Sequence, residues 1–230
     1  MKFTELNLPD VVQQGIVDAN FESLTPVQEE SIPLALQGKD VAAQAQTGTG
    51  KTAAFLISLF CKLLSSEKST SNNPRALVMA PTRELVVQIC KDAETLGKHT
   101  GLKVQPIFGG VDYEKQRQAL RDGVDIIVAT PGRLIDYFKQ RVFSMNRVEA
   151  LVIDEADRMF DMGFIKDLRY ILRKLPPFEK RQTMLFSATL SAQVMELAYE
   201  FMDLAEKVRI EPEKVTADNI DQILYHVSRK

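Results

Sequence analysis

Cysteine is scarce in this sequence, and nothing else in it marks a secreted protein. The chain of 230 residues has two cysteines, Cys61 and Cys90, and each stands alone in an apolar run typical of a helix. Without a paired spacing there is no disulfide framework of the kind that holds small secreted domains together. The two cysteines therefore indicate a reduced, cytosolic protein in which both thiols are buried like small hydrophobic residues.

Long apolar runs are also lacking. The longest fall far short of the ~20 residues that a helix needs to cross a bilayer. The first five residues, Met1 to Glu5, do not lead into the apolar region of a signal peptide. We therefore expect no membrane partner and a cytoplasmic location.

An excess of charge of one sign is the third absence. The chain has 29 Lys and Arg against 31 Asp and Glu, a formal net charge of -2. The overall balance does not mark a nucleic-acid binder, so any such surface must be a local array of positive groups. The rest of the composition, 45% apolar and 26% charged, is ordinary for a globular protein of one large domain or two small ones.

What the sequence does contain is a regular alternation of short apolar strands with helical segments. Strands are expected at 40–45, 76–80, 104–108, 125–129, 150–153, 184–186 and 207–210, with helices between them and two more helices at 8–19 and 26–37. Residues 65–74 are polar and predict a surface loop. The alternation predicts an α/β fold, a mostly parallel sheet with helices on both faces. Such sheets bind ligands at the carboxyl ends of their strands, where the motifs below lie.

A glycine-rich turn follows the first predicted strand and opens a helix. It predicts a phosphate-binding loop, because its glycines allow backbone N–H groups to turn inward, Lys51 can reach the outer phosphates, and the Thr52 hydroxyl can hold Mg²⁺. The expected nucleotide contacts are Ala45, Gln46, Thr47, Gly48, Thr49, Gly50, Lys51 and Thr52. Ala45 stands where the general P-loop pattern has Gly. A strand-to-helix turn that binds no ligand is the alternative.

Two carboxylates end the apolar strand at 150–153. Asp154 is placed to coordinate Mg²⁺ through water, and Glu155 to orient or deprotonate the water that attacks a γ-phosphate. With Lys51 they are the candidate catalytic residues. Acidic residues also favour a helix N-terminus through its dipole, so the pair has a simpler alternative explanation.

Residues 154–157 spell Asp-Glu-Ala-Asp, the name-giving motif of the DEAD-box RNA helicases, and the chain resembles this family over nearly its whole length. Residues 21–28 resemble the family's adenine-sensing motif, with Asn20 where Gly is usual, and Ala45 matches its form of the P-loop. The other first-domain motifs look present at 81–85, 109–110, 130–133 and 187–189. Residues 154–168 look most like the bacterial RhlB type. The resemblance implies a RecA-like P-loop NTPase domain that uses ATP and Mg²⁺.

The resemblance also implies residue roles. Gln28 would bond an adenine edge and Phe3 would stack on the ring, with Phe21 and Thr25 in the same adenine-sensing flank, residues 1–28. Sequence-independent contacts to the RNA backbone are implied for Pro81, Thr82, Arg83, Gly109, Gly110, Thr130 and Arg133. Coupling of ATP to RNA is implied for Asp157, Ser187 and Thr189. Simple packing of Phe3, ordinary helix capping, and pairing of Arg83 with a carboxylate are the alternatives.

The family's second domain, with its catalytic arginines, has no counterpart in the sequence. Residues 1–210 are expected to form the N-terminal ATP-binding domain and 211–230 the start of an interdomain linker. RNA, the second RecA-like domain and RNA-processing proteins are the expected partners. The longer protein is expected to remodel or unwind RNA duplexes by ATP hydrolysis, and the isolated domain to be nearly inactive. A P-loop GTPase, a small-molecule kinase, or a module that binds nucleotide and RNA without hydrolysis are the competing hypotheses.

Overall fold

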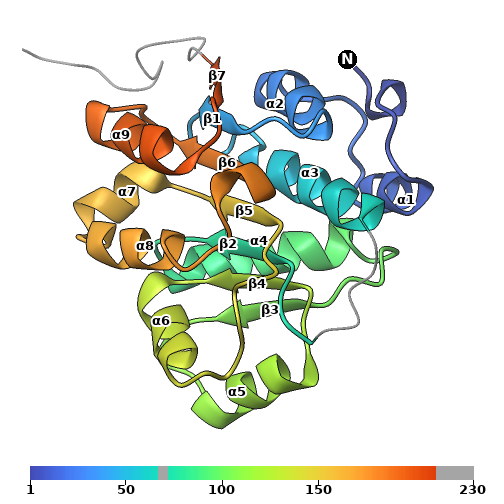
Figure 1. Ribbon diagram of the computed structural model, residues 1–230. Helices are drawn as coiled ribbons and strands as arrows, with labels where there is room; N and C mark the ends of the chain where they lie inside the picture. Colours follow the sequence, from blue (N-terminus) through green and yellow to red (C-terminus); the bar gives the residue numbers. More distant parts are fainter. Residues whose placement is uncertain (67–71, 211–230) are drawn as a thin grey trace, which may run out of the picture.

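A computed structural model describes residues 1–66 and 72–210 of the chain (Figure 1). Seven parallel strands in these residues form one sheet, in the order β3-β4-β2-β5-β6-β1-β7. The strands are β1 Val41–Gln44, β2 Ala76–Met79, β3 Val104–Ile107, β4 Ile126–Ala129, β5 Ala150–Ile153, β6 Gln182–Ser187 and β7 Glu206–Arg209. The α/β fold with a parallel sheet is confirmed.

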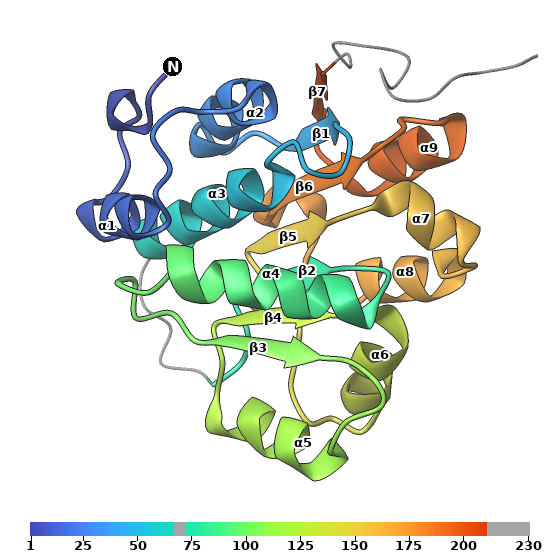
Figure 2. The ribbon, with the colours of Figure 1, turned by 180° about the vertical axis from the view of Figure 1, so that it is seen from behind.

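Helices cover both faces of this sheet (Figures 1 and 2). The described helices are α1 Asp10–Asp18, α2 Pro26–Leu36, α3 Lys51–Ser65, α4 Arg83–Leu96, α5 Tyr113–Asp122, α6 Pro131–Lys139, α7 Ala156–Asp161, α8 Ile165–Leu172 and α9 Ala192–Phe201, with 3₁₀ turns η1 Phe3–Glu5 and η2 Phe178–Lys180. Helices α1 to α4 share one hydrophobic core and α5 to α9 share the other.

The strands supply both cores because neighbouring side chains point to opposite faces. In β2, Val78 belongs to the core under α1 to α4, while Leu77 and Met79 belong to the core under α5 to α9. All four residues of β2, β4 and β5 are buried. The continuous apolar runs seen in the sequence therefore reflect burial on both sides of the sheet.

The predicted element boundaries need a few corrections. Strand β6 begins at Gln182, two residues before the apolar run that predicted it, because Gln182 and Thr183 are polar yet buried, and one hydrogen bond or more anchors each of them there. Gln182 Nε2 donates to Ala35 O at 2.7 Å, and the N–H of Thr183 donates to Asp40 Oδ1 at 2.7 Å. Helix α4 ends at Leu96, short of the predicted His99. Residues 67–71 of the predicted loop and the predicted linker 211–230 lie outside the described residues.

Helix α1 packs against α4 at a point where only glycine fits. A Cβ on Gly15 would lie 2.0 Å from the carbonyl oxygen of Leu96. The two helices approach closely because this position has no side chain. The contact fixes the N-terminal segment that carries Phe21.

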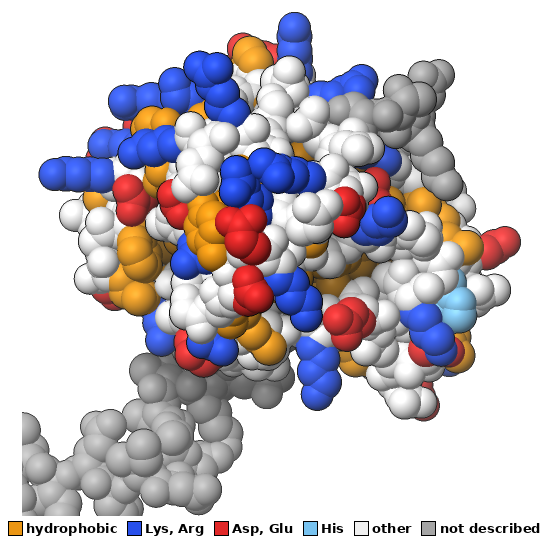
Figure 3. Space-filling view, turned by 90° about the horizontal axis from the view of Figure 1, so that it is seen from below, with side chains coloured by type: hydrophobic (Ala, Val, Ile, Leu, Met, Phe, Trp, Pro, Cys, Tyr) orange, Lys and Arg blue, Asp and Glu red, His pale blue; other side chains and the backbone are white. Residues whose placement is uncertain are grey.

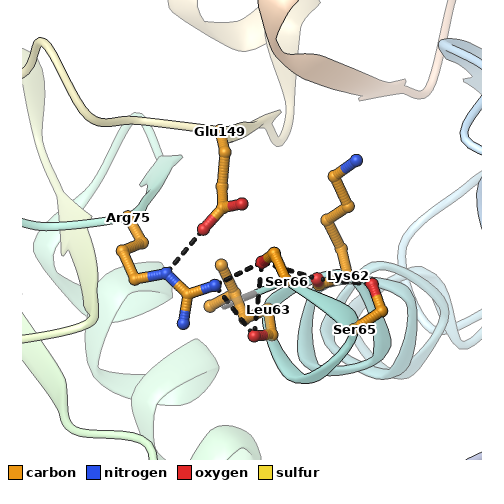
Figure 4. Close-up of polar contacts among 6 residues, drawn as sticks. All are labelled: Lys62, Leu63, Ser65, Ser66, Arg75 and Glu149. Atoms are coloured by element: carbon orange, nitrogen blue, oxygen red, sulfur yellow. Dashed lines mark hydrogen bonds and ion pairs between the residues drawn. The ribbon is translucent and has the colours of Figure 1, made fainter. Parts of the chain in front are cut away.

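Arg75, just before β2, ties the end of α3 to the start of β5 (Figure 4). Its side chain is 4% exposed. Its Nε donates to Glu149 Oε1 at 2.5 Å, and its Nη2 donates to Leu63 O at 2.8 Å and to the hydroxyl of Ser66. A cation is favourable at this position because the C-terminus of a helix carries partial negative charge.

Among residues 1–66 and 72–210, none of the helices combines the length and the apolar character needed to cross a bilayer.

Candidate functional site

The loop between β1 and α3 borders a cavity of about 920 Å³ at the carboxyl edge of the sheet. Gly48 and Gly50 line it with φ angles of +84° and +91°, a left-handed conformation that glycine adopts without strain. Gly50 is also required by space, since a Cβ there would lie 2.6 Å from Gln28 Nε2. The hydroxyl of Thr49 donates to Gln46 O at 2.7 Å and closes the loop. The cavity therefore meets the N-terminus of α3, where backbone N–H groups favour an anion.

Lys51 is the first residue of α3 and is only 6% exposed. Its Nζ is buried and has no hydrogen-bond partner within the described part of the chain. Burying an ammonium group without a partner is costly. An anionic ligand in the cavity would satisfy it, so the geometry suits a phosphate.

Asp154 and Glu155 follow β5 and line the same cavity. Burial raises the pKa of Asp154 to about 6, while the charge of Lys51 acts in the opposite direction. Glu155 has a φ of +50°, a left-handed conformation that is uncommon for glutamate and concentrates at functional sites. Its carboxylate pairs with Arg158 Nη1 at 3.0 Å. The three predicted catalytic residues thus lie around one cavity.

The residues predicted to hold Mg²⁺, Thr52 and Asp154, also line this cavity, from α3 and from the end of β5. Within the described ranges there is no group of three or more His, Cys, Asp or Glu side chains that could bind a metal by itself. Mg²⁺ usually takes only one or two protein carboxylates and completes its shell with phosphate oxygens and water. One carboxylate and one hydroxyl beside a phosphate-binding loop fit that requirement.

Asp157 connects the segment after β5 to the segment after β6. Its N–H donates to Ser187 Oγ at 3.1 Å, and its Oδ2 accepts from the Thr189 N–H at 3.0 Å and from the Thr189 hydroxyl at 3.2 Å. Burial acts to raise the pKa of Asp157, but the hydrogen bonds from Ser187, Arg158 and Thr189 outweigh it, and the pKa is lowered. The three residues predicted to act in coupling therefore contact one another.

The adenine-sensing flank reaches the cavity through Gln28, Thr25 and Phe21. Gln28 is 3% exposed, and its Oε1 accepts from the Thr25 N–H at 2.9 Å while its Nε2 donates to Gly50 O at 3.1 Å. Phe21 is 40% exposed. Phe3 is buried behind it, with the rings stacked at 6.2 Å, and is not among the residues that line the cavity. Of the two predicted rings, the structure thus presents Phe21 to the cavity and places Phe3, which was expected to stack on the adenine, behind it.

The residues predicted to bind RNA lie at the ends of β2, β3 and β4, which are neighbours in the sheet. Thr82 caps α4 by accepting the Leu85 N–H at 3.2 Å. Gly109 and Gly110 follow β3; a Cβ on Gly110 would lie 3.3 Å from Arg83 Nη1, and one on Gly109 would lie 4.0 Å from Arg133 Nη2. Pro81 ends the β2 segment, and Thr130 is the N-cap of α6. Arg83, Arg133 and the two glycines therefore form one group.

Aromatic rings hold both of these arginines, a feature that the sequence motifs did not predict. The Arg83 guanidinium lies 5.1 Å from the Phe108 ring centroid, and that of Arg133 lies 5.0 Å from Tyr113 and 5.6 Å from Tyr137. Such cation–π contacts orient a guanidinium without neutralising it. Tyr137 is four residues after Arg133 on the same helix, a spacing that could have revealed the pair. Tyr113 comes from another helix and left no local signal.

The fold and this cavity define a P-loop NTPase domain, and the family model described as DEAD/DEAH box helicase matches residues 25–197. The chain belongs to this family, as the motifs predicted. It is 52% identical over 226 residues to the ATP-dependent RNA helicase RhlB of Pseudoalteromonas atlantica, covering 98% of this chain and 54% of that protein. It is 51% identical to the protein of the same name from a Shewanella strain, covering 100% of this chain and 53% of that protein. The chain thus spans about half the length of these curated relatives.

Two solved structures share the fold. A DEAD box protein from Methanococcus jannaschii superposes with a TM-score of 0.84 at 35% identity, over 92% of this chain and 56% of that one. A hypothetical ATP-dependent RNA helicase from Sulfolobus tokodaii superposes with a TM-score of 0.78 at 37% identity, over 89% of this chain and 57% of that one. The RecA-like architecture and the similarity to the RhlB type are confirmed.

Proposed function

We propose that this chain is the ATP-binding and RNA-backbone-binding domain of an ATP-dependent RNA helicase. The observation that carries the proposal is the buried Lys51 ammonium group, which has no hydrogen-bond partner in the described part of the chain and lies at a helix N-terminus beside Asp154. The relatives that are about half identical to the chain are named ATP-dependent RNA helicases. Membership of that family disfavours the GTPase and the small-molecule kinase.

The phosphates would be bound by Lys51 and by backbone N–H groups of residues 45–52. Thr52 and Asp154 would hold Mg²⁺, which neutralises phosphate charge when it is bound. Glu155 would orient the attacking water and accept its proton. For this step the carboxylate of Glu155 must be free to face the water, so its ion pair with Arg158 has to open or rearrange.

Adenine would be recognised by Gln28, with Phe21 as the ring nearest the cavity and Phe3 supporting it from behind. The amide of Gln28 already uses one donor and one acceptor within the protein. An amide has a second N–H and a second lone pair, and these are available for an adenine edge.

The RNA backbone would contact the group at the ends of β2, β3 and β4. Arginine matches the shape of a phosphate, and the N-termini of α4 and α6 offer backbone N–H groups to it. No base edge is read in this arrangement, so we propose binding without sequence preference. Asp157, with Ser187 and Thr189, would connect this edge to the ATP site.

In the longer protein, we propose that residues 1–210 form the first RecA-like domain, that 211–230 begin a linker, and that a second RecA-like domain completes the ATP site. Remodelling or unwinding of RNA duplexes belongs to that longer protein, and RNA-processing proteins are proposed as further partners. Because both cysteines are free and buried, we place the protein in the reducing cytoplasm.

Calorimetric titration with Mg·ATP tests the nucleotide site. Lys51→Ala removes the group that reaches the outer phosphates, so its affinity should fall by at least about tenfold, as for a charged hydrogen bond of about 1.5–3 kcal/mol. Lys62→Ala, in the last turn of the same helix, is the matched control and should bind like the parent chain. Equal binding by the parent and Lys51→Ala would show that the loop does not hold phosphate.

A further inference from the structure

A second depression, about 640 Å³ in volume, lies at the C-terminal end of α6, whereas Arg133 lies near its N-terminal end. We call it the basic-aromatic groove and define it by Phe138, Lys139, Arg141, Tyr170 and Lys174, which all line it. These residues come from the ends of α6 and α8 and from the turn between α6 and β5. Neither the ATP site nor the proposed RNA contacts include any of them.

The charge of the groove is of one sign. Lys139, Arg141 and Lys174 are exposed, and no Asp or Glu is among the residues that line it. Within the described ranges none of the three forms an ion pair with a carboxylate. Figure 3 shows several Lys and Arg side chains over the upper part of the face seen from below, with hydrophobic and some acidic side chains among them. In a chain of net charge -2, this is a local array of positive groups.

An aromatic ring lies among these cations. The Nζ atoms of Lys139 and Lys174 lie 5.5 Å and 5.6 Å from the centroid of Tyr170. Two like charges beside one ring repel each other, and an anion between them would relieve that repulsion. By contrast, the depression beside Lys39 is lined by Asp40, Glu179, Asp203 and Glu206, so positive charge is not a general feature of the hollows on this surface.

Cations interleaved with aromatic rings suit a single-stranded nucleic acid better than an acidic peptide. The cations bind phosphates while the half-buried ring of Tyr170 offers a stacking surface that any base can use. The groove lies at the other end of α6 from Arg133, which is one of the proposed RNA contacts. Lys139 is six residues after Arg133, about 9 Å along the helix axis.

We propose that the basic-aromatic groove is a second binding site for single-stranded RNA, which holds the strand after it passes the Arg83 and Arg133 group. The inference rests on the proposed function, because it extends the same RNA path. The ligand of the groove is the phosphate backbone together with one stacked base. RNA long enough to reach from the first group to the groove should therefore bind more tightly than RNA that fills the first group alone.

The test compares two uridine oligomers, of about five and about twelve nucleotides, which bracket a short and a long single-strand site. Their affinities for the 230-residue chain are measured by fluorescence anisotropy at several salt concentrations. Lys139→Gln combined with Lys174→Gln should weaken binding of the longer oligomer and lower its salt slope by about 1.4, or 0.7 for each phosphate that is no longer neutralised. Binding of the shorter oligomer should not change.

Two further variants separate the contribution of base stacking from that of charge and control for effects away from the groove. Tyr170→Leu keeps an apolar side chain and every cation, so it should weaken the longer oligomer by at least about fivefold without changing the salt slope. Lys207→Gln is the matched control, because Lys207 on β7 also lies beside a tyrosine ring, with its Nζ 5.3 Å from the centroid of Tyr199 on α9. This pair is away from the groove. The affinity of Lys207→Gln for both oligomers should equal that of the parent.

Equal affinity of the parent for both oligomers would show that the groove does not bind RNA, while the proposed contacts around Arg83 and Arg133 would still stand. Failure of the parent to bind either oligomer would overturn RNA binding itself, and the groove with it. If the double Gln variant changed only the binding of polyglutamate, the groove would be a protein-binding surface and the inference would be wrong.

Discussion

Gln28 joins the adenine-sensing flank to the phosphate-binding loop at the scale of a single side chain. Its Oε1 accepts from the Thr25 N–H at the start of α2, and its Nε2 donates to the carbonyl oxygen of Gly50. The same amide faces the cavity. Under the proposed function, base recognition and the shape of the loop would therefore depend on one residue.

Replacing Gln28 with Ala should remove most of the preference of the chain for ADP over GDP. Two neutral hydrogen bonds to the base would be removed, at about 0.5–1.5 kcal/mol each, so the ADP affinity should fall by at least about fivefold. Fluorescent analogues of the two nucleotides measure this directly. Gln88→Ala is the control, since Gln88 lines the same cavity from α4. A parent chain that bound ADP and GDP equally would contradict the role of Gln28.

At the scale of elements, α3 and β5 carry the residues proposed to bind phosphate and Mg²⁺ at one end and are tied together at the other. Lys51 and Thr52 begin α3, and Asp154 follows β5. At the opposite ends, Arg75 bonds to Leu63 O near the end of α3 and to Glu149 just before β5. We call these contacts of Arg75 with Leu63 and Glu149 the latch. Because α3 and β5 are rigid, the latch helps to fix the distance between their other ends, where the cavity lies.

Removing the latch should lower the free energy of unfolding. For Arg75→Met we expect a loss of about 3 kcal/mol, the lower end for removing one partner of a buried pair, because Glu149 keeps some access to water. Arg75→Lys should recover only part of it, since an ammonium group cannot reproduce the planar fork. Urea denaturation measures both variants.

The control for the latch is Arg173→Met, which breaks an exposed ion pair with Glu200 and should cost less than about 1 kcal/mol. If the Arg75 and Arg173 variants unfolded at the same urea concentration, the latch would contribute nothing beyond a surface pair.

For the whole molecule, periodicity in the sequence predicted the strands, the helices and the edge of the sheet where the motifs lie. It did so because a strand buried on both faces needs a continuous apolar run. The start of β6 was missed because Gln182 and Thr183 are polar and are anchored by partners about 140 residues away in sequence. The residues of the candidate site could be predicted because a glycine-rich turn and a pair of carboxylates at the end of a strand are patterns that a short stretch of sequence reveals.

Contacts between distant segments could not be predicted in this way. The rings of Phe108 and Tyr113 under the two arginines come from other elements, and the position of Phe3 behind Phe21 depends on how η1 packs. The close approach of α1 to α4 at Gly15 likewise has no local signature. These features are set by tertiary packing, and they position the groups that the motifs supply.

At the scale of the whole molecule, the rate of ATP hydrolysis depends on whether an arginine can reach the γ-phosphate. In residues 1–66 and 72–210, Arg158 is the one arginine that lines the cavity, and it is paired with Glu155. An arginine finger is worth ~10³–10⁵ in the rate of phosphoryl transfer. We therefore expect the chain to bind nucleotide and to lack the group that stabilises charge on the γ-phosphate.

The need for an arginine from outside this chain is tested by measuring steady-state ATP hydrolysis with and without RNA. The measurement compares residues 1–230 as a monomer with a longer protein that has its natural downstream sequence. We expect residues 1–230 to bind nucleotide but to hydrolyse ATP very slowly, with little stimulation by RNA and no duplex unwinding. The longer protein should show RNA-stimulated hydrolysis, and Glu155→Gln in it should abolish turnover. Robust RNA-stimulated hydrolysis by residues 1–230 alone would contradict the account, because the catalytic arginine would then come from this chain.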